Sequence, residues 1–158
     1  MAITLVGVLL AGAGCTQHEV KDPRAAAVES TVQAYNDALV RGFAKMDMNE
    51  LSAVATEDQA TQEYFLMSAL GEERVRMIAH MRALSFDSVV FSGEASATVT
   101  TAETWDFTHQ SLDTSETVRE ELGVTYHLRY SLDLIEGQWL VAAVASLDSS
   151  STSQETTP

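Results

Sequence analysis

The sequence predicts one α+β domain, in which helices precede a sheet of antiparallel strands. Apolar residues recur every three or four positions in the first half of the chain, and the second half changes to strict alternation. No segment repeats. With 158 residues, of which 46% are hydrophobic, the chain can bury the core of one domain but not of two. We expect that domain to occupy residues 24–147.

An apolar stripe predicts the first helix. Its members are Val28, Val32, Tyr35, Leu39, Phe43 and Met46. A second helical stretch is expected to begin near Asn49, with Leu51 and Val54 on one face. Together these segments would supply the apolar faces that cover a sheet.

A third helix is predicted over residues 57–84. Its candidate core positions are Tyr64, Met67, Leu70, Val75, Ile78 and Met81. We expect Gly71 to bend or break this helix, because glycine costs about 1 kcal/mol relative to alanine inside a helix. A short strand at residues 86–91 would follow.

Alternation of period two predicts the long strands of the second half. Residues 95–109 would direct one set of side chains inward: Ala95, Ala97, Val99, Thr101, Glu103, Trp105, Phe107 and His109. The next strand would do the same with Val124, Tyr126, Leu128, Tyr130, Leu132 and Leu134. Glu136-Gly137 predicts a tight turn, and the closing strand would turn Trp139, Val141 and Ala143 inward. The opposite face is rich in Thr, Ser and charge, as expected of a sheet that faces water on one side.

Four segments of the chain are similar to one known group: VQAYNDAL, IAHMRAL, ATVTTAETWDF and TYHLRYSLDLIEGQWLVAAV. They resemble the nuclear transport factor 2-like superfamily, and most of all the domain at the intermembrane-space end of plastid-division proteins and in many bacterial envelope proteins. The resemblance implies a cystatin-like cone, with N-terminal helices packed on a curved antiparallel sheet. It says little about function, because this fold supports enzymes, binders and adaptors.

The single cysteine, Cys15, follows an uncharged apolar run of signal-peptide length, residues 1–14. Small residues before the cysteine resemble the lipobox of bacterial lipoproteins, which implies cleavage before Cys15 and acylation of its thiol, with palmitate among the chains. Residues 15–23 would then be a lipid-anchored tether. Gly12 stands where lipoboxes usually have Leu, and no basic residue precedes the run, so a plain secretory signal or a buried free thiol remains open.

The charge balance excludes some partners. Nine Lys and Arg residues face 23 Asp and Glu residues, which gives a net charge of -14 and disfavours nucleic acid. The last eleven residues, 148–158, lack apolar side chains and are expected to be disordered. We expect an envelope protein that faces the periplasm or the exterior, held to the membrane by its lipid and bound to a protein partner.

Glu103 is the most pointed candidate for chemistry, because it lies on the apolar face between Thr101 and Trp105. It could be a pocket acid or base, or a structural carboxylate paired with an Arg or a Tyr hydroxyl.

Binding residues are expected at Glu103, Trp105, Tyr126 and Tyr130. The four histidines form no recognisable metal site, and no cofactor is expected. The sequence favours a non-catalytic binding or scaffolding domain. The alternatives are an isomerase or hydro-lyase that uses Glu103 as its base, and a binder of lipid or metabolite without catalysis.

Overall fold

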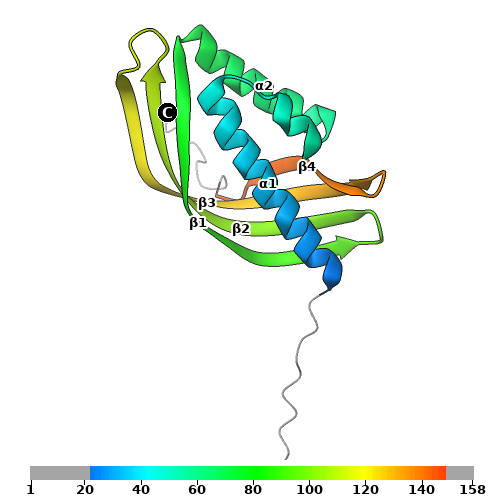
Figure 1. Cartoon of the computed structure of the whole chain (residues 1–158). Coiled ribbons are helices and arrows are strands. Elements are labelled where there is room, and N and C mark those ends of the chain that lie inside the picture. The colour runs from blue at the N-terminus through cyan, green and yellow to red at the C-terminus, as the bar shows by residue number, and fades with distance from the viewer. Residues whose placement is uncertain (1–21, 149–158) are drawn as a thin grey trace, which may run out of the picture.

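Two α-helices lie on one face of a four-stranded antiparallel sheet, which confirms the predicted α+β cone (Figure 1). The computed structural model describes residues 22–148. The elements in chain order are α1 (Pro23–Lys45), the 3-10 helix η1 (Asn49–Ala53), α2 (Glu57–Glu72), β1 (Val75–Ser92), β2 (Ser96–Ser111), β3 (Thr117–Ile135) and β4 (Gln138–Ser146). The predictions for the signal segment, for Cys15 and for the tail beyond residue 148 lie outside these residues. Within residues 22–148, no helix is long and apolar enough to cross a membrane.

The sheet has the order β1-β2-β3-β4, and each strand pairs with its neighbour along the chain. Register shifts interrupt all three pairings. Such bulges bend a strand and increase its twist, so the long strands curve around the helices (Figure 1). Glu136 and Gly137 have positive φ angles of 51° and 84°, as the predicted tight turn between β3 and β4 requires.

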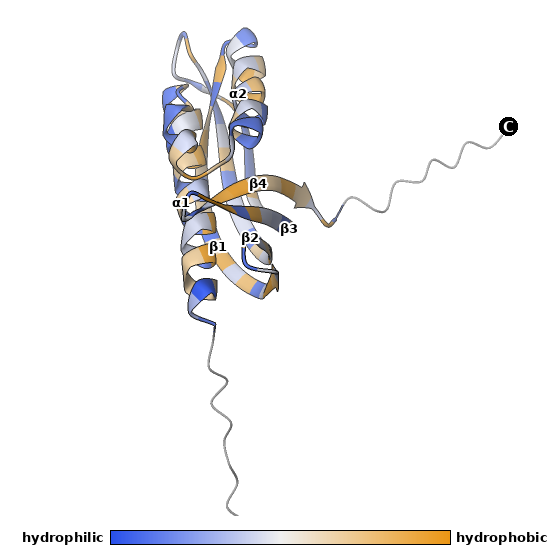
Figure 2. Cartoon of the chain, turned by 90° about the vertical axis from the view of Figure 1, so that its right-hand side faces the viewer, coloured by the Kyte–Doolittle hydropathy of each residue, from blue (hydrophilic) through white to orange (hydrophobic). Residues whose placement is uncertain are grey.

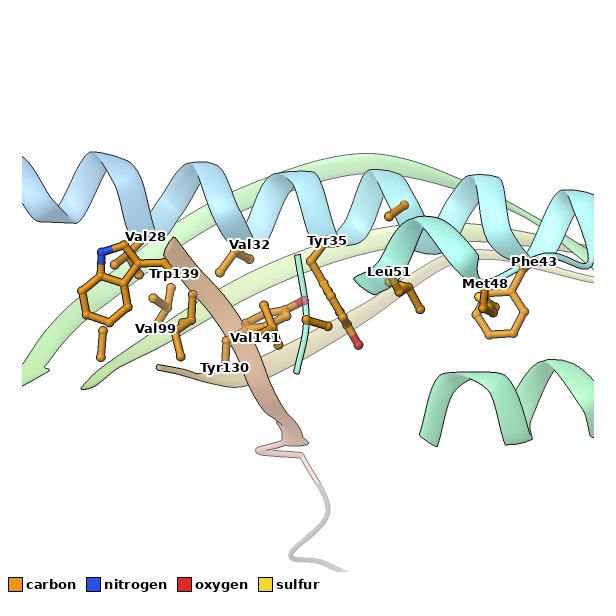
Figure 3. Close-up of a cluster of buried hydrophobic side chains, with 14 of the residues drawn as sticks. Val28, Val32, Tyr35, Phe43, Met48, Leu51, Val99, Tyr130, Trp139 and Val141 are labelled. Carbon is orange, nitrogen blue, oxygen red and sulfur yellow. The ribbon is translucent and has the colours of Figure 1, made fainter. Parts of the chain in front are cut away.

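Helix α1 supplies the centre of the core, as its apolar stripe predicts. Val28, Val32 and Tyr35 are almost fully buried, and they point toward side chains of the sheet (Figure 3). At the end of α1 the returning chain lies very close to Gly42. A Cβ at this position would lie 2.5 Å from Sδ of Met48, so the glycine makes room for that side chain. Asp22 caps the start of the helix by accepting a hydrogen bond from the backbone N–H of Arg24.

The prediction of one helix over residues 57–84 is wrong. Helix α2 ends at Glu72, the chain reverses at Arg74 with a φ of 58°, and β1 begins at Val75. The register of β1 shifts between Met81 and Ala83 and again between Phe86 and Ser88. These two bulges leave Met81 and Leu84, like Phe86 and Val89, on the inner face three residues apart. A bulged strand therefore has the spacing of a helix, and the expected short strand at residues 86–91 is only its second half.

Four predicted core positions are also wrong: Tyr64, Ile78, Ala95 and Ala143. Ile78 lies on the outer face of β1, between the inward Met77 and Ala79, and Ala95 is exposed in the turn between β1 and β2. Tyr64 on α2 is 53% exposed, because α2 directs other residues toward the core. Ala143 on β4 is exposed, because a register shift between Ser131 and Leu132 moves Val144 to the inner face in its place. At Ala143 the register shift separates the real inward positions from the regular spacing, whereas α2 is an uninterrupted helix that turns another face to the core.

Candidate functional site

A pocket of about 340 Å³ lies among α1, α2 and the inner face of the sheet. All four predicted binding residues, Glu103, Trp105, Tyr126 and Tyr130, line it. The rest of its wall is mainly apolar: Leu39, Val40, Phe43, Leu66, Met77, Ala79, Phe107, Leu128 and Val144. We call it the cone pocket. Its volume and apolar wall are those of a site for a small molecule or for a few apolar side chains.

Glu103 is buried and its carboxylate is surrounded by donors from its own chain. Oε1 accepts hydrogen bonds from the hydroxyls of Thr101 (2.8 Å) and Tyr130 (2.7 Å) and from Nδ2 of Asn36 (3.4 Å). Oε2 accepts one from Nε1 of Trp105 (2.8 Å). No salt bridge between described residues includes Glu103. Of the two predicted partners, the structure has the Tyr hydroxyl and not the Arg.

Tyr130 and Asn36 connect this carboxylate to α1. The Tyr130 hydroxyl also lies 3.2 Å from Oδ1 of Asn36, so three elements meet at one polar cluster. Burial, followed by the negative charge of Glu103, raises the pKa of Tyr130 far above its ordinary value. The hydroxyl therefore stays protonated and remains a donor to Glu103.

A second carboxylate, Glu63 of α2, lines the same pocket. Its Oε1 accepts hydrogen bonds from the Tyr35 hydroxyl (2.7 Å) and from Nε2 of Gln59 (2.9 Å). Burial raises the pKa of Glu63, and these two hydrogen bonds oppose the rise only in part. The rings of Tyr35 and Tyr130 meet edge to face at 6.2 Å, so the two carboxylates lie on either side of one aromatic pair.

Aromatic rings of β2 and β3 form another part of the pocket wall. Trp105 stacks on Phe107 with their ring centroids 5.9 Å apart, and Phe107 meets Tyr126 edge-on at 6.3 Å. Such pairs have few rotamers and present a large, rigid apolar surface. A flat apolar group could lie against them.

The hydrogen bonds restrict the chemistry of the pocket. A carboxylate has about four lone-pair sites. Glu103 accepts from four donors of its own chain, three on Oε1 and one on Oε2, so only one lone-pair site, on Oε2, is left without an internal donor. The hydroxyls of Tyr35 and Tyr130 and the indole N–H of Trp105 are likewise engaged, and they are not free to stabilise a developing oxyanion. The buried end of the pocket is therefore better suited to holding a group than to transferring its proton.

The three histidines within residues 22–148 lie away from this pocket. His80 and His127 are exposed. His109 is buried near the C-terminal end of β2, and its Nε2 lies 3.0 Å from Nη2 of Arg119. Burial, followed by the charge of Arg119, lowers the pKa of His109. Among residues 22–148, no group of three His, Cys, Asp or Glu side chains could hold a metal ion.

Three residues of the site were missed by sequence reasoning: Asn36, Gln59 and Glu63. Asn36 could have been found, because it lies four residues after Val32 and three before Leu39, inside the apolar stripe of α1. Glu63 had no comparable signal. It lies beside Tyr64, which was predicted as a core position, and a carboxylate in the chain next to large apolar residues of a helix gives no sign of burial.

No family model matches the chain, and no curated protein sequence matches it either. Solved structures do. The chain is similar to the intermembrane space region of the chloroplast protein ARC6, with 17% identity, 79% of this chain and 95% of that chain covered, and a TM-score of 0.65. It is also similar to a ketosteroid isomerase-like protein from Erwinia carotovora atroseptica (17% identity, 80% and 98% covered, TM-score 0.52).

A periplasmic fragment of TraM is a third similar structure, with 10% identity, 75% of this chain and 96% of that chain covered, and a TM-score of 0.52. Similarity at such low sequence identity supports a shared fold but carries no information on activity. The arrangement of two helices on a curved four-stranded sheet agrees with all three neighbours and with the resemblance of the sequence motifs. The chain therefore has the nuclear transport factor 2-like fold.

Proposed function

We propose that this protein is a non-catalytic receptor of the bacterial cell envelope, whose cone pocket takes an apolar group of a partner protein. The observation that carries the proposal is the engagement of Glu103 by four internal donors, three on Oε1 and one on Oε2, inside a mainly apolar pocket. An isomerase or hydro-lyase of this fold would need that carboxylate free to move a proton. A receptor needs only a shaped wall and a carboxylate that keeps the wall in place.

The envelope location rests on two independent supports. Residues 1–14 have the character of a signal peptide, and Cys15 follows small residues as in lipoproteins. Two similar structures are an intermembrane space region and a periplasmic fragment. A lipid anchor at Cys15 would hold the domain at the membrane, because several acyl chains together bind a bilayer stably.

The anchor is tested with Cys15→Ser in a bacterial host fed with labelled palmitate. We expect the wild-type protein to take up label and to fractionate with membranes, and the variant to do neither. A wild-type protein without label, together with a variant that still fractionates with membranes, would contradict the anchor.

The receptor pocket is tested with N-phenyl-1-naphthylamine, a neutral apolar dye that fluoresces in dry sites. Ala79→Leu places three extra carbons at a buried position in the pocket wall, and dye affinity should fall by about tenfold. Ala83→Leu is the matched control, because Ala83 is exposed on the same strand. Equal dye binding by both variants would show that the dye lies elsewhere and would remove the pocket from the proposal.

A further inference from the structure

Helix α2 exposes several of its most hydrophobic residues to solvent and turns more polar residues toward the core. Its buried residues are Gln59 and Met67, whereas three consecutive large apolar residues, Tyr64, Phe65 and Leu66, are 53%, 65% and 58% exposed. Figure 2 shows hydrophobic residues among hydrophilic ones along this helix. The polar contacts of Gln59 and Glu63 with Tyr35 hold the helix in this orientation. Leu66 lines the cone pocket, whereas Tyr64 and Phe65 remain as large exposed apolar side chains outside it, which indicate an interaction site.

A second hollow borders the same helix, on the side of Tyr64. Its volume is about 940 Å³, and it lies between η1, the first half of α2 and the β3–β4 end of the sheet. Its apolar lining is formed by Met46, Met48, Met67, Tyr64, Ile135, Leu140, Ala55 and Ala60. We call it the methionine groove. Methionine side chains are unbranched and polarizable, so a groove lined by them can adapt to a partner's side chains.

The charged residues that line the groove are all acidic. Asp47 and Glu57 lie in its lining, which contains no Lys, Arg or His. Helix α2 itself has four acidic residues, Glu57, Asp58, Glu63 and Glu72, and no basic residue. The nearest cations on α1, Arg41 and Lys45, are already paired with Glu50 at 2.6 and 3.4 Å.

From this surface we infer a docking site for a basic amphipathic helix of a partner protein. Its apolar side chains would enter the methionine groove and contact Phe65, and its Lys or Arg side chains would face Asp47 and Glu57. A second copy of this chain fits poorly, because a symmetric contact would bring two acidic α2 surfaces together. This surface is separate from the cone pocket, so the inference goes beyond the proposed receptor function.

The test uses the purified full chain with ¹³C-labelled methionine methyl groups. The probe is a Leu/Lys peptide whose leucines form one helical face. We expect the methyl signals of Met46, Met48 and Met67 to shift on titration. The signals of Met77, which lines the cone pocket, and of Met81 on β1 should stay in place. A scrambled peptide of the same composition and a Leu/Glu peptide serve as controls and should cause no shift.

Variants test the two parts of the surface separately. Phe65→Ser should weaken the peptide by about tenfold, whereas Leu122→Ser, at a 66% exposed position on β3, should leave its affinity unchanged. Glu57→Lys should weaken binding and reduce its dependence on salt.

Three results would overturn the inference: shifts confined to Met77, equal binding of the scrambled peptide, or dimers of the free chain that Phe65→Ser dissociates. A shift of Met77 alone would instead favour the cone pocket as the peptide site, so the two proposals can fail independently.

Discussion

Helices α1 and α2 lie on the same face of the sheet but differ in what they bury. Helix α1 directs its apolar stripe into the core and keeps its charged residues outside, whereas α2 buries Gln59 and exposes Phe65. Each helix also contacts one carboxylate of the cone pocket. Asn36 of α1 donates to Glu103, which has donors on both oxygens, and α2 supplies Glu63, which has donors on one oxygen only. The difference agrees with a core role for α1 and with the docking surface that we infer on α2.

The largest effect should follow from Phe43→Ala on α1. Phe43 is buried in the core beside Met48 (Figure 3), so the truncation leaves a cavity and should lower the free energy of unfolding by about 3–5 kcal/mol. Urea denaturation measures the loss. A change below about 1 kcal/mol would mean that the core can collapse around the gap and that α1 is less essential than we infer.

Glu103→Gln should cost about 1–3 kcal/mol of stability. The amide keeps the shape, but in either orientation its NH2 group must face a donor, either Trp105 or the cluster of Thr101 and Tyr130. Thermal melts measure the effect, and Glu120→Gln at an exposed position of β3 is the control. A Glu103→Gln variant that melts above wild type and loses a turnover that wild type has would favour the enzyme.

Glu63→Gln should change stability in a pH-dependent way. Burial raises the pKa of Glu63 in the folded chain above its ordinary value of 4.5. At pH values between the ordinary and the raised pKa, folding is therefore accompanied by uptake of a proton. The contribution of Glu63 to stability is therefore full below pH 4.5 and is lost as the pH rises through the raised pKa. The variant lacks this loss, so its urea midpoint should rise relative to that of wild type as the pH is raised above 4.5.

Asp113→Asn provides the opposite sign for comparison. The hydrogen bond from Arg74 lowers the pKa of Asp113, so the stability that it contributes is present above its ordinary pKa and is lost as the pH falls. This variant should approach wild type at acid pH. If Glu63→Gln followed the same trend, Glu63 would be a favourably paired carboxylate and not a desolvated one.

The smallest effect should follow from Phe65→Ala on α2. The substitution is chemically the same as Phe43→Ala, but Phe65 is 65% exposed, so stability should change by no more than about 0.5 kcal/mol. The same urea titration compares the two variants directly. A large loss at Phe65 would show that the residue packs in the folded chain, and the docking surface on α2 would then have no support.

The sequence predicted α1, β2, β3 and β4, but it predicted β1 only in its second half. The inward face of β2, from Ala97 to Trp105, follows strict alternation and lies where expected. Strand β1 was hidden, because its bulges replace the spacing of two by a spacing of three at Met81–Leu84 and Phe86–Val89. A bulge depends on how two strands pair, and neither strand shows it alone.

The candidate site was predicted in part. Glu103 stood out because a carboxylate on an apolar strand face needs a partner, and its neighbour Trp105 is that partner two residues away. Glu63 and Gln59 were not predicted, because a polar residue on a helix is normally solvated. Only the position of the Tyr35 hydroxyl makes their burial favourable, and that hydroxyl lies 28 residues from Glu63 in the chain.

The sequence by itself determined the fold class, the apolar stripe of α1, the inward face of β2 and the unusual place of Glu103, because each follows from periodicity along one segment. The tertiary structure alone decided where α2 ends, which side it turns to the core and which donors surround each carboxylate. These features depend on contacts between segments far apart in the chain, such as the one between Asn36 and Glu103. The exposed Tyr64 and Phe65 belong to this second group, because exposure is set by what the rest of the molecule leaves uncovered.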